Sequence, residues 1–237
     1  MALAIATADL REAGCDSPRL DAELLLAHAL GTTRTALHLH PERVLDDAAC
    51  ARFAQLVARR RAREPVAYIR GTRAFRHIDL MVDSRVLVPR PETELLVEVA
   101  LGLPRGARVC DVGTGSGAVA LALKHERPDL EVVATDVSAD ALAVARANAA
   151  ALRLDVAFVH GDLLSAVDGP LDAVLSNPPY VPDGDRVTLA PEVAAHEPAE
   201  ALFAGSDGLA VLRRLARAAA ARAPFVAFEV GKGQAPA

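Results

Sequence analysis

Aromatic residues and cysteines are scarce in this 237-residue chain. It has no tryptophan and only 3% aromatic residues, yet 52% of its residues are hydrophobic. A chain of this length and composition can bury a sizeable core in one or two domains. Its three cysteines, Cys15, Cys50 and Cys110, are widely spaced and show neither a CxxC nor a Cys/His ligand pattern. We therefore expect reduced thiols and no bound metal.

The chain also lacks a basic charge excess, a signal-peptide pattern and a long apolar run. Its formal net charge is −5, from 26 Lys and Arg against 31 Asp and Glu, which argues against a surface that coats nucleic acid non-specifically. The N-terminus has no basic segment followed by an uninterrupted apolar stretch, and no apolar run has membrane-spanning length. We expect a cytoplasmic protein with no membrane association and no stable nucleic-acid complex.

Residues 1–69 are expected to form a helical bundle that recognises a partner, because they show helical spacing and no catalytic motif. Glycines at positions 14 and 31 are suited to end helices. The run Arg59-Arg60-Arg61-Ala62-Arg63 lies at the end of the last long helix. Two interpretations stay open for it: a solvated face that opposes the negative end of the helix dipole, which we favour, and direct contact with nucleic acid.

The apolar pattern changes to period two in residues 70–90, which predicts a β-hairpin linker. Its apolar positions are Phe75, Ile78, Leu80, Val82, Val86 and Val88. The prolines in residues 88–94 stiffen the next segment, which is either a rigid linker or a wall of an active site. Residues 91–237 then alternate apolar runs with helical segments. The chain is thus expected to be an α/β protein with a doubly wound, Rossmann-like parallel sheet.

A glycine-rich turn follows the first predicted strand of that sheet. Its glycines have GxGxG spacing and are Gly113, Gly115 and Gly117. This spacing lets a ligand approach the backbone and the N-terminus of the next helix. Asp136 ends the second predicted strand, where a carboxylate can accept hydrogen bonds from a ribose diol. Alternatively, Asp136 is the N-cap of the helix that starts near Ser138.

The segment Asn177-Pro178-Pro179-Tyr180 follows a buried apolar run at 172–176. Proline has no N–H, so the Asn177 side-chain oxygen and the outward Pro178 carbonyl can form two neighbouring acceptors for a planar –NH2 group. Tyr180 supplies a flat face for stacking. The alternative is an ordinary strand-ending turn. In a doubly wound sheet, however, ligands bind outside the carboxyl ends of the strands, where the glycine turn, Asp136, Asp162 and Asn177 would all lie.

These motifs together resemble a class I S-adenosylmethionine-dependent methyltransferase that methylates amino groups. The resemblance rests on Asp-Val-Gly-Thr-Gly-Ser-Gly at 111–117, Asp136, Gly161-Asp162 and the Asn-Pro-Pro-Tyr segment. Pro-Arg-Pro-Glu-Thr-Glu at 89–94, His-Glu-Pro at 196–198 and Gly-Ser-Asp-Gly-Leu at 205–209 narrow it to the HemK/PrmC family. Members of that family are protein-(glutamine-N5) methyltransferases of peptide chain release factors, and the resemblance covers nearly the whole chain.

The resemblance implies S-adenosylmethionine as the methyl donor, S-adenosylhomocysteine as the product and a release-factor glutamine as the acceptor. It implies a donor site made of Asp111, Gly113, Thr114, Gly115, Ser116, Gly117, Asp136, Asp162, Leu163 and Asn177. It implies an acceptor site made of Asn177, Pro178, Pro179, Tyr180 and Arg90, with Asn177 and Pro178 as the catalytic pair. The bundle of residues 1–69 would dock the release factor.

The family's sheet carries a final hairpin, whereas this chain stops at Ala237, so its fifth strand is expected to be an unprotected edge. Two other functions stay open. One is N-methylation of an exocyclic amino group of a base in RNA or DNA, which offers the same –NH2 to the same motif after base flipping. The other is a docking protein that binds S-adenosylmethionine without turnover.

Overall fold

The computed structural model describes residues 1–40, 42 and 44–235. By its internal contacts the chain forms two compact units. The first comprises residues 1–71 together with 191–196, and the second comprises residues 72–190 together with the chain from 197 onward. The short segment Pro191–His196 therefore groups with the first unit, although the chain on both sides of it belongs to the second.

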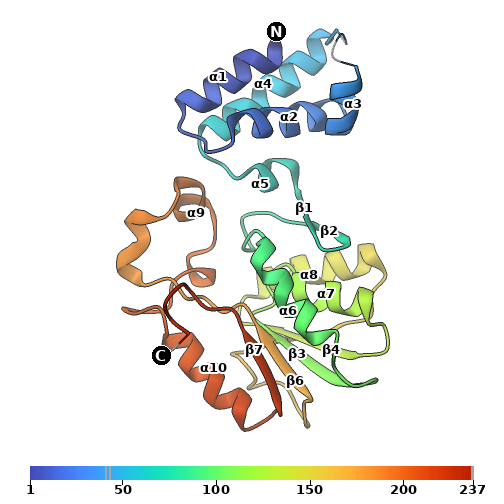
Figure 1. Ribbon diagram of the computed structural model, residues 1–237, viewed down its shortest axis with the longest axis vertical. Coiled ribbons are helices and arrows are strands. Elements are labelled where there is room, and N and C mark those ends of the chain that lie inside the picture. Colours follow the sequence, from blue (N-terminus) through green and yellow to red (C-terminus); the bar gives the residue numbers. More distant parts are fainter. Residues whose placement is uncertain (41, 43, 236–237) are drawn as a thin grey trace. The chain divides into compact units, whose positions relative to one another are not determined.

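The first unit is helical (Figure 1). Its helices are α1 (Ala2–Glu12), α2 (Pro18–Ala29), α3 (Arg34–Leu39), α4 (Asp47–Arg61), α5 (Val66–Arg70) and α9 (Pro191–His196). Side-chain caps fix two of the starts: Thr33 accepts from the Ala36 N–H at the start of α3, and Asp46 accepts from the Ala49 N–H at 2.7 Å at the start of α4. Phe53 is buried among the apolar residues of α1 and α2, so a small core holds this bundle together.

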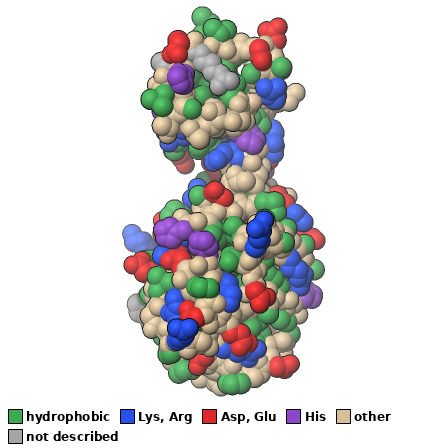
Figure 2. Space-filling view, turned by 90° about the vertical axis from the view of Figure 1, so that its right-hand side faces the viewer, with side chains coloured by type: hydrophobic (Ala, Val, Ile, Leu, Met, Phe, Trp, Pro, Cys, Tyr) green, Lys and Arg blue, Asp and Glu red, His purple; other side chains and the backbone are tan. Residues whose placement is uncertain are grey.

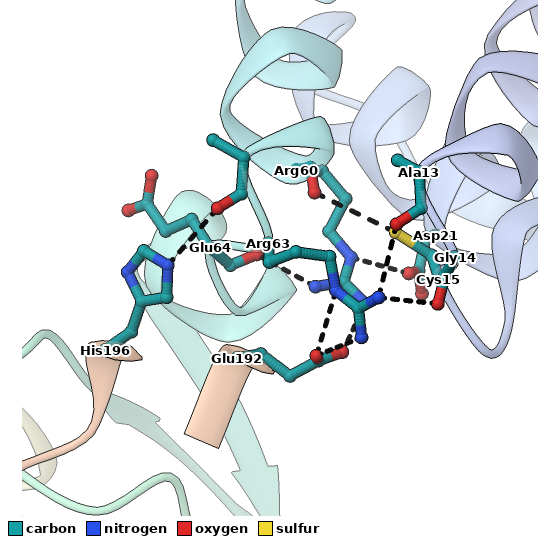
Figure 3. Close-up of polar contacts among 10 residues, drawn as sticks. Ala13, Gly14, Cys15, Asp21, Arg60, Arg63, Glu64, Glu192 and His196 are labelled. Carbon is teal, nitrogen blue, oxygen red and sulfur yellow. Dashed lines mark hydrogen bonds and ion pairs between the residues drawn. The ribbon is translucent and has the colours of Figure 1, made fainter. Parts of the chain in front are cut away.

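Arg59 and Arg61 at the end of α4 are exposed, as the interpretation of a solvated face requires, but Arg60 is buried, so that interpretation is wrong for Arg60. Arg60 is 5% exposed; its Nε donates to Asp21 at 2.8 Å and its Nη2 donates to Glu192 of α9 at 2.9 Å. Arg63 also pairs with Glu192 and donates to backbone carbonyls of the α1–α2 turn (Figure 3). A buried guanidinium requires such partners, and they lie far from Arg60 in the sequence.

The second unit begins with the expected β-hairpin, which is shorter than its apolar pattern. Strands β1 (Thr72–Phe75) and β2 (Ile78–Met81) pair antiparallel. The expected apolar side chains are all buried, but Val86 and Val88 lie outside any strand because the chain turns after Asp83, whose carbonyl accepts from the Val86 N–H. Beyond Met81, the period-two pattern therefore indicates which side chains are buried, but not that the segment is a strand.

The predicted parallel sheet is confirmed. Its strands are β3 (Arg108–Val112), β4 (Glu131–Asp136), β5 (Ala157–His160), β6 (Ala173–Ser176) and β7 (Phe225–Phe228). All pairs are parallel, and the order is β5-β4-β3-β6-β7, with β7 at an edge. From β3 the chain adds β4 and β5 on one side, and then adds β6 and β7 on the other side of β3. The topological switch point therefore lies between β3 and β6, and ligands bind at such a point, beyond the carboxyl ends of the strands.

Helices cover both faces of this sheet (Figure 1). They are α6 (Glu94–Ala100), α7 (Ala118–Glu126), α8 (Ala139–Leu152) and α10 (Ala210–Ala220), with short 3-10 turns η1 (Pro91–Thr93), η2 (Asp183–Thr188) and η3 (Ala199–Ala201). Cys110 of β3 packs with Leu215 of α10, whereas the next side chain, Asp111, accepts from the Ala120 N–H of α7 on the opposite face. In the described ranges, no helix has the length and apolar character needed to cross a membrane.

Candidate active site

The glycine turn joins β3 to α7 at the carboxyl edge of the sheet. The N–H groups of Gly113 and Thr114 donate to the Thr135 carbonyl of β4, at 2.8 and 3.0 Å. Gly117 is the N-cap of α7 with a φ of 84°, and a Cβ added there would lie 2.8 Å from Leu121 Cδ1. Only glycine fits that position without strain, so Gly117 allows the turn to pack closely against α7.

The Asp111 carboxylate stabilises the glycine turn through hydrogen bonds. It is 2% exposed, and its Oδ2 accepts from Thr114 Oγ1 at 2.7 Å and from the Ala120 N–H at 3.2 Å. Burial raises the pKa of Asp111 to about 6, although the two hydrogen bonds act in the opposite direction. Asp111 therefore holds Thr114 and the start of α7 together.

Asp136 links the glycine turn to the next crossover. Its Oδ2 accepts from the Gly115 N–H at 2.8 Å, and its Oδ1 accepts from the Ser138 N–H at 2.9 Å. Burial raises its pKa, against the effect of these bonds. The N-cap of α8 is Ser138, whose side chain accepts from the Ala141 N–H, so the N-cap alternative for Asp136 is wrong. Each carboxylate oxygen keeps a lone pair that can accept from a ligand hydroxyl.

Asn148 of α8 is a supporting residue that the sequence analysis missed. It is 1% exposed, and its Nδ2 donates to the Ser116 carbonyl at 2.9 Å and to the Met81 carbonyl at 3.0 Å. Its Oδ1 accepts from the Met81 N–H at 2.8 Å. The side chain thus ties the glycine turn to β2. A lone Asn in an alanine-rich helix was the only signal for it in the sequence.

The Asn-Pro-Pro-Tyr segment begins directly after β6, beside the glycine turn. Asn177 Nδ2 donates to Thr93 Oγ1 at 3.0 Å, and the Thr93 hydroxyl donates to Glu229 at 2.7 Å. The Tyr180 hydroxyl donates to the other oxygen of Glu229 at 3.2 Å. Burial, followed by the charge of Glu229, raises the pKa of Tyr180 to about 12, so Tyr180 is a neutral donor at ordinary pH.

Two recesses meet at Asn177, and both also contact Gly113 and Gly115. The first runs along the ends of β4 and β5. The predicted site residues that line it are Gly113, Gly115, Asp136, Asp162, Leu163, Asn177, Pro178 and Pro179. The second lies over the glycine turn. The predicted site residues that line it are Arg90, Asp111, Gly113, Thr114, Gly115, Ser116 and Asn177. Gly117 and Tyr180 line neither recess.

Comparisons with known proteins cover most of the chain. Residues 1–71 match the model of the PrmC N-terminal domain, and residues 91–221 match that of the methyltransferase small domain. The release factor glutamine methyltransferase of Deinococcus radiodurans is 50% identical over 223 residues, which cover 92% of this chain and 80% of that protein. The chain belongs to the release factor glutamine methyltransferase family.

A second relative in this family is the release factor glutamine methyltransferase of Mycolicibacterium smegmatis. It is 47% identical over 224 residues, which cover 92% of this chain and 78% of that protein. Among solved structures, a methyltransferase from Pyrococcus furiosus matches 44% of this chain and 53% of its own, with 24% identity and a TM-score of 0.38. The relatives confirm the family that the motifs predicted, and with it a methyltransferase.

Two of the residues to which the family resemblance gave ligand roles already have charged partners. Arg90 Nη2 donates to both oxygens of Glu197 at 2.7 Å, and the Glu197 side chain is only 2% exposed. Asp162 pairs with Arg214, and about half of each side chain is exposed. Arg90 is therefore held in place by a buried carboxylate, and its role toward a substrate stays a prediction. Among the residues that the structure describes, no three His, Cys, Asp or Glu side chains gather as metal ligands would.

Proposed function

We propose that this chain transfers a methyl group from S-adenosylmethionine to the side-chain amide nitrogen of a glutamine in a peptide chain release factor. The observation that carries the proposal is the place of Asn177. It lines both the recess that contains Asp136 and the recess over the glycine turn, so an amide held by Asn177 would lie where the two recesses meet. The named activity of the two relatives supports the same acceptor.

The residues present fit the donor. The first recess offers a carboxylate, Asp136, with free lone pairs for the ribose hydroxyls, and Leu163 and Asp162 beside the end of β5 for the adenine. A Cβ added at Gly113 or Gly115 would meet no atom within 4 Å, so the space beside the turn is open to a ligand. When bound there, S-adenosylmethionine supplies an electrophilic methyl carbon on a sulfonium.

The task of the chain is to make an amide nitrogen reactive toward that carbon. Amide nitrogen is a poor nucleophile because its lone pair is delocalised into the carbonyl. The Asn177 side-chain oxygen and the Pro178 carbonyl would accept hydrogen bonds from the two N–H groups of the glutamine amide. These acceptors hold the nitrogen in line with the methyl carbon and stabilise the positive charge that develops on it during attack. Transfer would break the bond between the sulfur and the methyl carbon and leave S-adenosylhomocysteine. The N-methylated amide cation is acidic and would give its proton to water, so no strong general base is required.

The bundle of the first unit would dock the release factor, since a separate helical domain without catalytic residues fits a recognition role. We further propose that the protein works in the cytoplasm, without a stable complex with nucleic acid. On the face of the second unit drawn in Figure 2, basic and acidic side chains are interspersed. The formal net charge of −5 also supports this proposal, because a protein that coats nucleic acid is usually basic.

The experiment offers isotopically methyl-labelled S-adenosylmethionine with three acceptors in separate reactions: a purified release factor, bulk RNA and bulk DNA. We expect label on the release factor alone. Label on RNA or DNA alone would favour methylation of a base amino group. Donor binding without label on any acceptor would favour the docking protein without turnover.

A further inference from the structure

A chain of hydrogen bonds joins Asn177 to Glu229 through Thr93. The link from Asn177 Nδ2 to Thr93 Oγ1 is 3.0 Å, and the link from Thr93 Oγ1 to Glu229 Oε2 is 2.7 Å. The three residues come from segments far apart in the sequence: Thr93 ends η1, Asn177 follows β6 and Glu229 follows β7. Thr93 is only 5% exposed. Glu229 also accepts from the Tyr180 hydroxyl at 3.2 Å, so one carboxylate serves both ends of the Asn-Pro-Pro-Tyr segment.

The chemistry of these groups fixes the direction of every bond in the chain. An ionised carboxylate only accepts hydrogen bonds, so the single hydroxyl proton of Thr93 must go to Glu229. The Thr93 oxygen can then only accept from its other partner, Asn177. The Asn177 side chain must therefore present its –NH2 to Thr93, and its carbonyl oxygen must point the other way. No hydrogen bond to Asn177 Oδ1 comes from any residue that the structure describes.

We propose that Thr93 and Glu229 are positioning residues for methyl transfer, which hold the Asn177 amide so that Oδ1 faces the substrate –NH2. This inference rests on the proposed function, because the orientation matters only if Asn177 accepts from an amino group. A flipped Asn177 would present two N–H donors to the substrate's N–H donors, which is repulsive. The carboxylate of Glu229 therefore sets, through one hydroxyl, which end of the Asn177 amide can meet the acceptor.

The other end of the motif is fixed by Gln234, which follows Glu229 in the chain, and by Gly208, which lies before α10. Gln234 Nε2 donates to the Tyr180 carbonyl at 3.0 Å. A Cβ added at Gly208 would lie 2.2 Å from the same carbonyl oxygen, so the chain there passes against the motif without room for a side chain. With the hydroxyl of Tyr180 held by Glu229 and its carbonyl by Gln234, the motif has little freedom to rotate Asn177 away from the recesses.

The test compares Thr93→Val, Thr93→Ser and Glu229→Gln with the wild type. Valine keeps the shape of threonine without the hydroxyl, and serine restores the hydroxyl. Glutamine at position 229 can donate as well as accept, so the hydrogen bonds from Asn177 through Thr93 could then run in the opposite direction. We expect Thr93→Val and Glu229→Gln to lower kcat by about tenfold to a hundredfold, with the donor Kd within about twofold and the fold intact by circular dichroism. Thr93→Ser should restore most of kcat. Thr188→Val is the matched control, because the Thr188 hydroxyl donates to the Asp185 carbonyl within the exposed η2 turn.

A second cycle separates positioning from general damage. In the Asn177→Ala background, Thr93→Val should lower kcat no further, because the group that Thr93 orients is absent. An equal loss in both backgrounds, or full activity of Thr93→Val, would overturn the inference.

A third readout needs no turnover, because the Asn177 side-chain –NH2 signals can be followed by ¹⁵N NMR. They should shift on Thr93→Val and recover on Thr93→Ser, and signals that do not move contradict the inference. If the wild type methylates a nucleic acid and not a release factor, the proposed function fails. The same kinetic comparisons then test the positioning role on that acceptor.

Discussion

Gly115 donates its backbone N–H to Asp136 Oδ2 at 2.8 Å, so the tip of the glycine turn is held by the residue that ends β4. One carboxylate thus shapes the turn and also lines the recess beside it. Because Asp136 both holds the turn and lines the recess, a substitution at Asp136 is the most informative test of the donor site.

Asp136→Ala should weaken S-adenosylmethionine binding by about tenfold to a hundredfold, since hydrogen bonds to a charged group are each worth about 1.5–3 kcal/mol. The loss combines the ribose contacts with the loosened Gly115. Isothermal titration of the donor measures it. The control is Asp155→Ala, which removes an exposed carboxylate from the loop before β5. Equal affinities for the wild type and Asp136→Ala would remove Asp136 from the donor site.

The stability of the fold should depend on pH through Asp111, whose pKa burial raises to about 6. In an unfolded chain this pKa is about 4. The folded state therefore binds the proton more tightly, and this contribution to stability is complete below about pH 4 and lost as the pH rises through about 6.

Asp111→Asn is uncharged at every pH, so relative to the wild type it should gain about 3 kcal/mol in free energy of unfolding between about pH 4 and 6.5. Urea unfolding of both proteins at a series of pH values measures the difference. A difference that stays constant over this range contradicts the account.

Gly117→Ala should destabilise the second unit by about 1–3 kcal/mol and weaken donor binding. The new Cβ would lie 2.8 Å from Leu121 and 3.3 Å from Ala145, in a backbone conformation with a φ of 84° that alanine rarely adopts. Gly184→Ala is the matched control, since a Cβ there meets nothing within 4 Å and should change stability by less than about 0.5 kcal/mol. Thermal unfolding of both variants gives the comparison, and similar losses would contradict it.

Arg60→Met should destabilise the first unit by about 3–5 kcal/mol, because it leaves the Asp21 carboxylate without its buried cation and leaves Glu192 with Arg63 alone. The neighbouring Arg61→Met is the control, since Arg61 is exposed on the same helix. Hydrogen exchange of α4 amides reports on this unit alone. An equal effect of the two substitutions would show that the buried pairs are not what distinguishes Arg60.

The strands of the sheet could be predicted from the sequence because their signal is local. β3 and β6 are short apolar runs, and a run buried on both faces in a parallel sheet has that pattern. The buried state of Arg60 could not be predicted, because its partners Asp21 and Glu192 lie 39 and 132 positions away. Within the site, the hydrogen-bond partners of Asn177 could not be predicted for the same reason.

Asn177 and the glycine turn are recognisable motifs, whereas the partners of Asn177 come from elsewhere in the chain. Thr93 lies 84 positions before Asn177 in a proline-rich segment, and Glu229 follows the last strand. Thr93 belongs to the Pro-Arg-Pro-Glu-Thr-Glu motif at 89–94, but neither that motif nor the sequence around Glu229 indicates the hydrogen bonds that link Thr93 to Asn177 and to Glu229. Their contribution exists only once η1, β6 and β7 come together, so the side chains that recognise a ligand could be predicted from sequence better than those that orient them.

The most direct test of the account is to find the atom that receives the methyl group. After incubation with labelled S-adenosylmethionine, tandem mass spectrometry of the release factor should place the label on the side-chain amide nitrogen of one glutamine. Asn177→Ala should bind the donor with nearly unchanged affinity and transfer the methyl group at least about a hundredfold more slowly. Label on any other atom, or an equal transfer rate for Asn177→Ala, would contradict the central claim.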